Sequence, residues 1–294
     1  MVEFLNTGEV HMQSKFLGLS HVAVIAAGLS GAAFGPAAPS LAAGDPVKAE
    51  GYLKEANKAL EKGDAKTAVI QLKNAVQADP DNGRARFELG SVELRLGDYL
   101  SAEKELRNAI DRKFDRDQVA PPLAETLLRM GKTKELLDEI PAGDRMPETE
   151  ALVRITRGFA LLSQRNIEQA KQSFSDAIAR TAKPARAQLG LARAFAASDN
   201  LPEAVNETKK SLESDPKYAE GWAFLGQLQR VQGDTAAAHA SYDKSVELNP
   251  ANEFARLNRA ALFISEGKFD EAEADIKPVL KPIQISRPRT ISRR

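Results

Sequence analysis

Apolar and small side chains recur along this chain at the three- and four-residue spacing of amphipathic helices, in pairs of short segments joined by a turn. The clearest pair spans residues 220–250. Trp222 and Leu225 mark its first helix, and Gly233 is placed to end that helix in the left-handed conformation. Asp234 can cap the second helix, which ends before Pro250 because a residue preceding a proline is driven out of the α region.

The same pattern returns every 34 residues. The small residue that opens each second helix is expected at Ala68, Ala102, Leu136, Ala170, Ala204, Ala238 and Ala272. The turns fall at Gly63, Gly97, Gly131, Arg165, Asp199, Gly233 and Gly267. The eighth position of each unit is always small: Ala56, Gly90, Ala124, Gly158, Ala192, Gly226 and Ala260. Small residues let helices approach closely, and larger residues further along are expected to fill the gaps: Leu72, Leu106, Phe174 and Tyr242.

We therefore predict an all-α fold, a right-handed α-solenoid of about seven helix–turn–helix units within residues 44–282. The units are expected near residues 49–82, 83–116, 117–150, 151–184, 185–218, 219–252 and 253–282. The order of Trp, Leu-Gly, small, aromatic, small and Pro in residues 220–250 resembles the tetratricopeptide (TPR) pattern. Trp222 is expected to be buried between the fifth and sixth units.

The third unit, 117–150, is degenerate. Pro121 and Pro122 stand where its first helix should already be under way, so we expect a loop at 112–120 and a helix starting near Pro122. Pro141 should cut the second helix short and begin a loop to Pro147. We expect a bend or a weak point here, but no full domain boundary, because the 34-residue register is kept.

Composition narrows the function by exclusion. The 294 residues contain 41 Lys plus Arg and 41 Asp plus Glu, so no overall field favours nucleic acid. The absence of Cys excludes disulfides, thiolate zinc sites and a cysteine nucleophile. The acidic run from Asp270 to Asp275 is interpreted as a solvated helix face.

No motif for catalysis, a cofactor or a metal is found. His239 is the one histidine after residue 43, and no Cys or second His could share a metal with it, so it is interpreted as a half-exposed helix residue. Gly131-Lys132-Thr133 imitates the end of a phosphate-binding loop but lacks the earlier glycine and a preceding strand. We predict that the protein is not an enzyme.

Residues 1–43 have the features of a secretory signal peptide. Lys15 precedes an apolar run at 22–34, and Ser40 and Ala42 supply small residues for cleavage after Ala42, with Ala43 as the alternative site. Met12 is an alternative start. The competing interpretation is a membrane anchor, but a run of 13 apolar residues rich in Gly and Ala is short for a span. We expect an exported, periplasmic protein with no transmembrane span after cleavage.

A groove lined by the first helix of each unit is the expected binding site. Positions 2, 5, 9, 12 and 13 of the units should face it, and the candidate residues are Asn57, Arg84, Phe87, Arg95, Arg129, Phe159, Arg186, Leu189, Arg193 and Arg230. Apolar positions with arginines between them suit an extended or helical peptide, or an acidic polymer. The alternative is that some of the apolar residues pack helix against helix. The Lys/Asn arrangement with which some TPR domains hold a C-terminal carboxylate is not reproduced, since only Asn57 matches it.

The succession of residues 52–80, 96–106 and the shortened stretch 121–132 resembles the start of the TPR-repeat proteins of bacterial PEP-CTERM and exopolysaccharide systems, the PrsT type. That resemblance implies an exported scaffold that binds protein partners, with polysaccharide-export machinery as the candidate. This chain lacks the lipid-attachment cysteine of that family and is shorter than its arrays. The alternative function is a generic periplasmic peptide-binding adaptor or chaperone.

The repeat pattern stops near residue 282. Pro278 lies inside the expected last helix, which should fray or kink, and Ile264, Ile276 and Leu280 have no obvious cover. Residues 283–294 are basic, contain Pro288 and are expected to be disordered. Two explanations stay open: truncation of a longer array, which we favour, or pairing of this end with another subunit.

Overall fold

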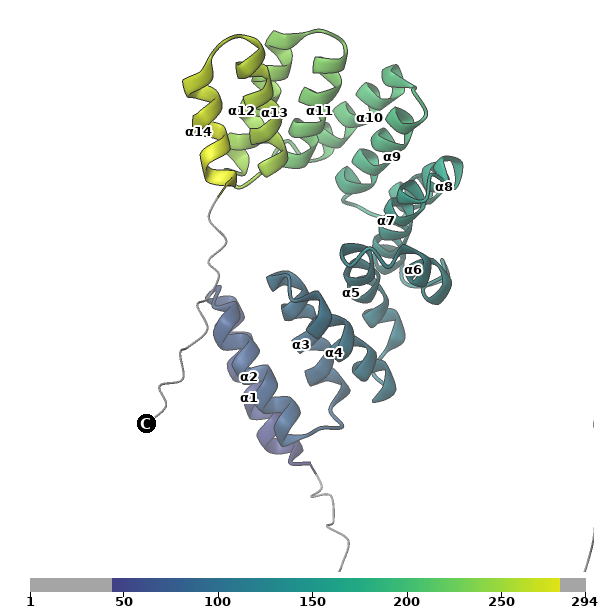
Figure 1. The fold of residues 1–294 in the computed structure, drawn as a ribbon. Coiled ribbons are helices and arrows are strands. Elements are labelled where there is room, and N and C mark those ends of the chain that lie inside the picture. The colour runs from purple at the N-terminus through teal and green to yellow at the C-terminus, as the bar shows by residue number, and fades with distance from the viewer. Residues whose placement is uncertain (1–43, 281–294) are drawn as a thin grey trace, which may run out of the picture. The chain divides into compact units, whose positions relative to one another are not determined.

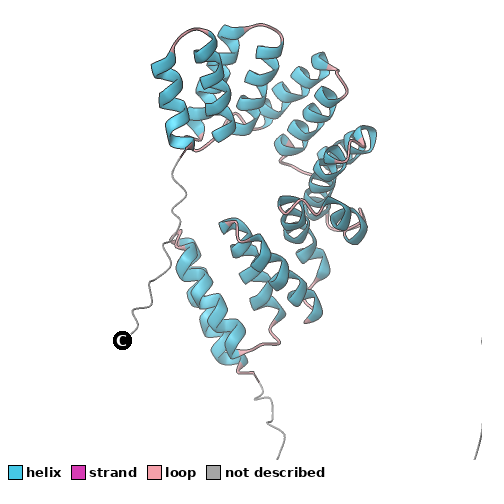
Figure 2. Ribbon diagram, viewed as in Figure 1, coloured by secondary structure: helices cyan, strands magenta, loops and turns pink. Residues whose placement is uncertain are grey.

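The computed structural model describes residues 44–280, which form fourteen helices and no strand (Figures 1 and 2). The helices are α1 (Pro46–Glu61), α2 (Ala65–Ala78), α3 (Gly83–Leu96), α4 (Tyr99–Asp111), α5 (Arg116–Arg129), α6 (Thr133–Glu139), α7 (Pro147–Ser163), α8 (Ile167–Ile178), α9 (Ala185–Ala197), α10 (Leu201–Ser214), α11 (Ala219–Val231), α12 (Thr235–Leu248), α13 (Glu253–Ser265) and α14 (Phe269–Val279). They pack in seven pairs, so the expected all-α, paired-helix fold is confirmed. The expected signal peptide and the basic tail at 283–294 lie outside the described residues.

Every turn inside a helix pair contains one residue in the left-handed region, at the position that the 34-residue period predicts. Five of these residues are glycines, with φ between 73° and 82°. The other two are Arg165, with φ of 61°, and Asp199, with φ of 56°. The period therefore holds even where the glycine is missing, because the backbone of the turn is imposed by the two helices that it joins.

Close contact within and between pairs depends on the small eighth positions, all seven of which are buried. Phe174 of α8 is fully buried, and its ring lies between Gly158 of α7 and Gly190 of α9. A Cβ at Gly158 would approach the ring to 2.6 Å, and one at Gly190 to 2.3 Å. Both glycines are therefore needed for the ring to fit. Leu72, Leu106 and Tyr242 are buried in the same way, as expected.

The fourth position of three units carries a side chain that bonds back to the preceding unit. Arg86 donates to the carbonyl of Pro80 at 2.9 Å, and Arg256 to that of Pro250 at 2.7 Å. Trp222 does the same through Nε1, which lies 2.9 Å from the carbonyl of Pro216.

This role corrects the expectation that Trp222 is a buried core residue. Its ring is only half-buried, whereas Phe224 and Leu225 beside it are buried. The apolar face of α11 runs through Phe224 and Leu228, and Trp222 lies off that face because its indole N–H needs a partner at the unit boundary.

The third unit differs from the expectation. α5 begins at Arg116, not near Pro122, and both Pro121 and Pro122 lie inside it. An interior proline costs roughly 3 kcal/mol. Three residues of α5 offset that cost, because Val119, Leu123 and Leu127 are buried and each contributes about 1.5–3 kcal/mol.

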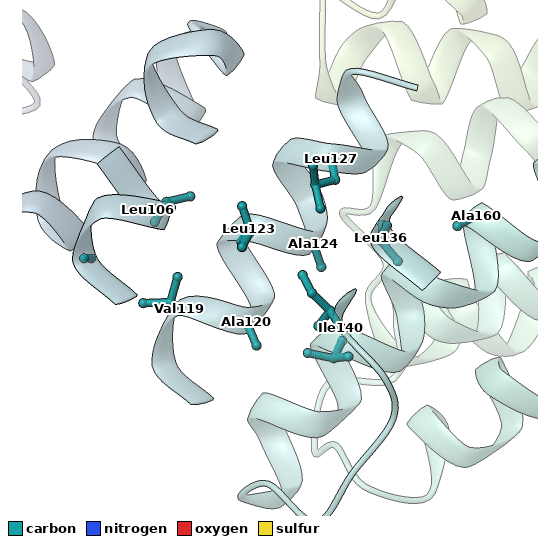
Figure 3. Packing of buried hydrophobic residues seen from close by; sticks show 11 residues of the cluster. Leu106, Val119, Ala120, Leu123, Ala124, Leu127, Leu136, Ile140 and Ala160 are labelled. Atoms are coloured by element: carbon teal, nitrogen blue, oxygen red, sulfur yellow. The ribbon is translucent and has the colours of Figure 1, made fainter. Parts of the chain in front are cut away.

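The same core holds the third unit to its neighbours on both sides. Figure 3 shows this cluster, which joins α5 to Leu106 of α4 and to Ala160 of α7. α6 has only seven residues and ends at Glu139, before Pro141, as expected. Packing is therefore continuous through the degenerate unit, despite its short second helix.

The last pair also departs in one detail from the sequence interpretation. Asp275, expected on a solvated face, is 2% exposed. It accepts hydrogen bonds from Arg256 at 3.1 Å and from Arg259 at 2.6 Å. α14 ends one residue after Pro278. Ile264 and Leu280 are exposed, as expected, but Ile276 is half-buried and so differs from the expectation.

The first prediction concerns the left-handed turn at Arg165. Arg165→Gly should stabilise the protein by about 1 kcal/mol. Glycine has no steric penalty in the left-handed conformation, and this gain exceeds the additional conformational entropy that glycine loses on folding. Gln164→Gly is the control, since Gln164 has φ of −90°, so glycine there relieves no strain, adds entropy cost and removes the 3.2 Å hydrogen bond from Gln164 to Thr133. Urea unfolding followed by circular dichroism measures both. A loss of stability in Arg165→Gly would contradict the turn geometry.

The second prediction separates the core role of Phe174 from the boundary role of Trp222. Phe174→Ala should cost roughly 3–5 kcal/mol because it leaves a cavity between two glycines. Trp222→Ala should cost about 1–2 kcal/mol, for one hydrogen bond and a partly buried ring. Trp222→Arg should cost less than Trp222→Ala, since Arg86 and Arg256 make the same bond. Equal losses for Phe174→Ala and Trp222→Ala in thermal melts would refute this ranking.

Candidate functional site

Side chains from four successive helix pairs line a cavity of about 530 Å³. We call it the α5–α9 pocket. Its lining residues are Glu125, Leu128 and Arg129 of α5, Phe159 of α7, Arg186, Leu189 and Arg193 of α9, and Tyr218 and Glu220 at the start of α11. The lining mixes charged, aromatic and aliphatic side chains.

The repeat itself brings these residues together. Glu125, Phe159 and Arg193 occupy the ninth position of three consecutive units, so they stand 34 residues apart. Arg186 and Glu220 occupy the second position of two consecutive units in the same way. The ninth position follows the buried small residue by one step around the helix, which turns it away from the helix–helix contact.

Glu125 is the electrostatic centre of the α5–α9 pocket. One of its carboxylate oxygens accepts from Nε of Arg129 at 2.8 Å, and the other from Arg186 at 2.6 Å. Desolvation by burial acts to raise the pKa of Glu125, but the charge of Arg186 and the hydrogen bonds from Arg186 and Arg129 outweigh it and lower that pKa. Glu125 is therefore a carboxylate at neutral pH, shared by two guanidinium groups.

Arg193 has a different environment. Its guanidinium lies 5.9 Å from the ring centre of Phe159 and 5.5 Å from that of Phe224, which places it within cation–π range of both. The residue is exposed to solvent and lines the α5–α9 pocket. Desolvation by the surrounding protein nevertheless lowers the pKa of Arg193, and the same effect raises the pKa of Tyr218.

Five of the ten candidate residues from the sequence meet in this pocket: Arg129, Phe159, Arg186, Leu189 and Arg193. Leu189 is only 1% exposed and belongs to a core cluster, so it forms the floor. The other five candidates, Asn57, Arg84, Phe87, Arg95 and Arg230, do not line it.

Two of those five have partners of their own. Arg84 pairs with Glu88 at 2.8 Å, and Phe87 stacks on Phe114 with ring centres 4.8 Å apart. Phe87 thus takes the helix-packing role that was the alternative interpretation for the apolar candidates.

Sequence reasoning missed Glu125, Glu220 and Tyr218. Glu125 and Glu220 stand at the ninth and second positions, so the rule that selected the other residues also points to them. They were passed over because only apolar residues and arginines were expected in the groove. Tyr218 precedes α11 at the last position of its unit, which lies outside the rule.

A larger cavity of about 670 Å³ lies beside α4, α5 and the loop after α6. Two of its three arginines, Arg107 and Arg145, already have acidic partners. Arg107 pairs with Glu103, Glu135 and Glu139, and Arg145 with Glu150 at 2.9 Å. Most of the charge there is paired internally, although Arg116 has no carboxylate within 4.0 Å among residues 44–280. The α5–α9 pocket adds two aromatic side chains, Phe159 and Tyr218, and is the better candidate for a ligand.

Residues 44–280 contain no group of three or more His, Cys, Asp or Glu side chains arranged to hold a metal ion. Within the same residues, no helix is both long and apolar enough to cross a membrane. His239 is half-buried, with Nε2 lying 2.9 Å from Glu266 and its ring beside Phe263.

Comparison with known proteins places most of these helices in one class of repeat. Residues 53–117 and 224–277 match one family model described as Tetratricopeptide repeat, and residues 161–228 match a second model with the same description. Neither of the matching models describes a catalytic domain.

Individual relatives are distant and longer. U-box domain-containing protein 70 of Oryza sativa subsp. japonica is 22% identical over 210 residues, which cover 69% of this chain and 25% of that protein. An Hsp70-Hsp90 organizing protein of Triticum aestivum is 33% identical over 97 residues, covering 33% of this chain and 17% of that protein. The chain therefore spans a quarter or less of the length of these two curated relatives.

A solved tetratricopeptide repeat protein from Parabacteroides merdae ATCC 43184 has the same fold. Its structure superposes with a TM-score of 0.61 at 20% identity, covering 79% of this chain and 92% of that one. At this identity the likeness shows the fold alone.

Proposed function

We propose that this chain, which belongs to the tetratricopeptide repeat proteins, is a non-catalytic scaffold that holds a segment of a protein partner in the α5–α9 pocket. The observation that carries the proposal is the pocket itself, in which side chains of four helix pairs converge. Its volume of about 530 Å³ suits several residues of peptide. Mixed guanidinium, aromatic and aliphatic groups are the chemistry that recognises peptides in grooves.

The pocket favours binding over catalysis. A hydrolytic or acid–base site needs a nucleophile and a base within hydrogen-bond reach of each other. The pocket has no Ser, Thr or His among its lining residues, and of its two carboxylates, those of Glu125 and Glu220, the first is held by two arginines. A scaffolding role is also in keeping with the relative whose name describes the organising of Hsp70 and Hsp90.

The place of action that we propose is the bacterial periplasm. Support comes from residues 1–43, with Lys15 before the apolar run at 22–34 and small residues at Ser40 and Ala42. The partners that we propose belong to exopolysaccharide or PEP-CTERM surface-protein export, on the resemblance of residues 52–80, 96–106 and 121–132 to that family. A generic periplasmic peptide-binding chaperone is the alternative, supported by the pocket alone.

Export makes a prediction about mass. Expressed with residues 1–43 in a Gram-negative host, the protein should be recovered from the periplasm with a mature mass that begins at Ala43 or Gly44. Intact-mass spectrometry of osmotic-shock and cytoplasmic fractions measures this. A full-length product confined to the cytoplasm would contradict export.

Peptide binding in the α5–α9 pocket makes a second prediction. A photo-crosslinking amino acid at Glu220, which is exposed and lines the pocket, should crosslink peptides from a random decapeptide pool. The same group at Lys209, exposed on α10 outside the pocket, is the matched control and should not. Mass spectrometry of the digested adducts identifies the crosslinks. Equal crosslinking at both positions would place peptide binding elsewhere.

Immobilised wild-type protein and a periplasmic extract separate the two kinds of partner. Retention of polysaccharide-export or sorting proteins supports the first proposal. Retention of many unrelated unfolded proteins supports the chaperone alternative.

A further inference from the structure

The three arginines of the α5–α9 pocket differ in one respect: within residues 44–280, two have an anionic partner and one has none. Arg129 and Arg186 share the carboxylate of Glu125. Among residues 44–280, no carboxylate lies within 4.0 Å of the guanidinium of Arg193. We propose that Arg193 anchors the side-chain carboxylate of an Asp or Glu within the bound peptide, an inference that rests on the proposed function above.

The surroundings of Arg193 hold its guanidinium ready for such a partner. Phe159 lies on one side at 5.9 Å and Phe224 at 5.5 Å, so the planar group is positioned by two rings before a ligand arrives. Fixing a guanidinium in advance reduces the entropy lost when it binds. A carboxylate is its natural partner, because the fork of N–H groups matches the two carboxylate oxygens.

Desolvation adds a reason for Arg193 to take an anion. Although Arg193 is exposed on the pocket side, the protein around it removes part of its hydration and lowers its pKa, and Tyr218 and Glu220 offset this only in part. A ligand carboxylate in contact would supply the missing counter-charge. A neutral peptide in the same pocket would leave the guanidinium further desolvated and unpaired, which is unfavourable.

Glu125 sets how many carboxylates the α5–α9 pocket accepts. By bonding to Arg129 at 2.8 Å and to Arg186 at 2.6 Å, it occupies the two other guanidinium groups. Its own negative charge opposes a second acidic group nearby. The pocket therefore selects for a single acidic residue, and Glu125→Gln should open it to a second one.

The pocket suits an acidic peptide better than an acidic sugar. A sugar ring usually packs on an open aromatic face, but Phe159 is covered by the guanidinium groups of Arg186 at 5.8 Å and of Arg193 at 5.9 Å. The ring of Phe174 packs edge-to-face with the same ring, with the two ring centres 5.0 Å apart. Leu128 supplies an apolar contact for the residues that flank the acid in a peptide.

The experiment uses a random octapeptide pool, acetylated and amidated so that only side chains carry charge, passed over the immobilised full-length protein. Retained peptides are sequenced by mass spectrometry. Wild type should enrich Asp or Glu at a single position by about tenfold, the effect of roughly 1.4 kcal/mol of binding energy. Arg193→Gln should still retain peptides but lose that enrichment. Arg193→Lys keeps the charge without the fork and should retain only part of it.

The matched control is Arg180→Gln, which removes an exposed arginine at the end of α8, outside the pocket, and should leave the enrichment unchanged. Glu125→Gln should add enrichment at a second position. Thermal melts of each variant establish that it is folded.

The outcomes separate the two proposals. Peptides retained without acid enrichment, or enrichment that survives Arg193→Gln, would overturn the role of Arg193 and leave the peptide scaffold standing. Retention of no peptide at all would overturn the scaffold and the anchor together. Binding of a polyuronate oligosaccharide that Arg193→Gln abolishes, with no acidic peptide preferred, would show that the ligand is a sugar and overturn this inference.

Discussion

The structure depends on the distance between the helices, which one contact repeated along the chain determines. Phe174 fits between α7 and α9 only because Gly158 and Gly190 have no Cβ. Tyr242 meets Gly226 in the same way, with 2.8 Å available to an added Cβ. Side chains at the next position, Phe159 and Arg193 among them, are thereby held at the spacing that forms the α5–α9 pocket. The chemistry of the pocket follows from the packing beneath it.

In the α5–α9 pocket, the desolvation of Glu125 and Arg193 is opposed by nearby charges to different extents. Glu125 is partly buried, yet two guanidinium groups keep its pKa low. Arg193 is flanked by aromatic rings, and no carboxylate of the described residues lies within ion-pair distance of it. The internal ion pairs stabilise the fold locally, while the uncompensated group leaves binding energy for a partner. One site thus combines a carboxylate shared by two arginines with a third arginine held between aromatic rings.

Sequence reasoning reached the helices because the period is a physical requirement. Each turn needs a left-handed residue, and this identifies the position even where Arg165 or Asp199 replaces glycine. The sequence-based prediction failed where burial of a helix overrides the rule that proline is excluded from helix interiors, as for Pro121 and Pro122 inside α5. The column rule points to every lining residue of the pocket except Tyr218, although only half of the ten candidates chosen with it line the pocket. Glu125 was not selected, because only apolar residues and arginines were expected there, and no local pattern shows its ion pair with Arg186 two units later.

The hydrogen bond between Trp222 and the carbonyl of Pro216 has a practical consequence. Trp222 is the single tryptophan of the chain, and its indole N–H is bonded across the boundary between two helix pairs. Indole emission responds to hydrogen bonding and to water. The protein therefore carries its own optical reporter at one defined joint, where opening of the α10–α11 boundary can be followed by fluorescence without any added label.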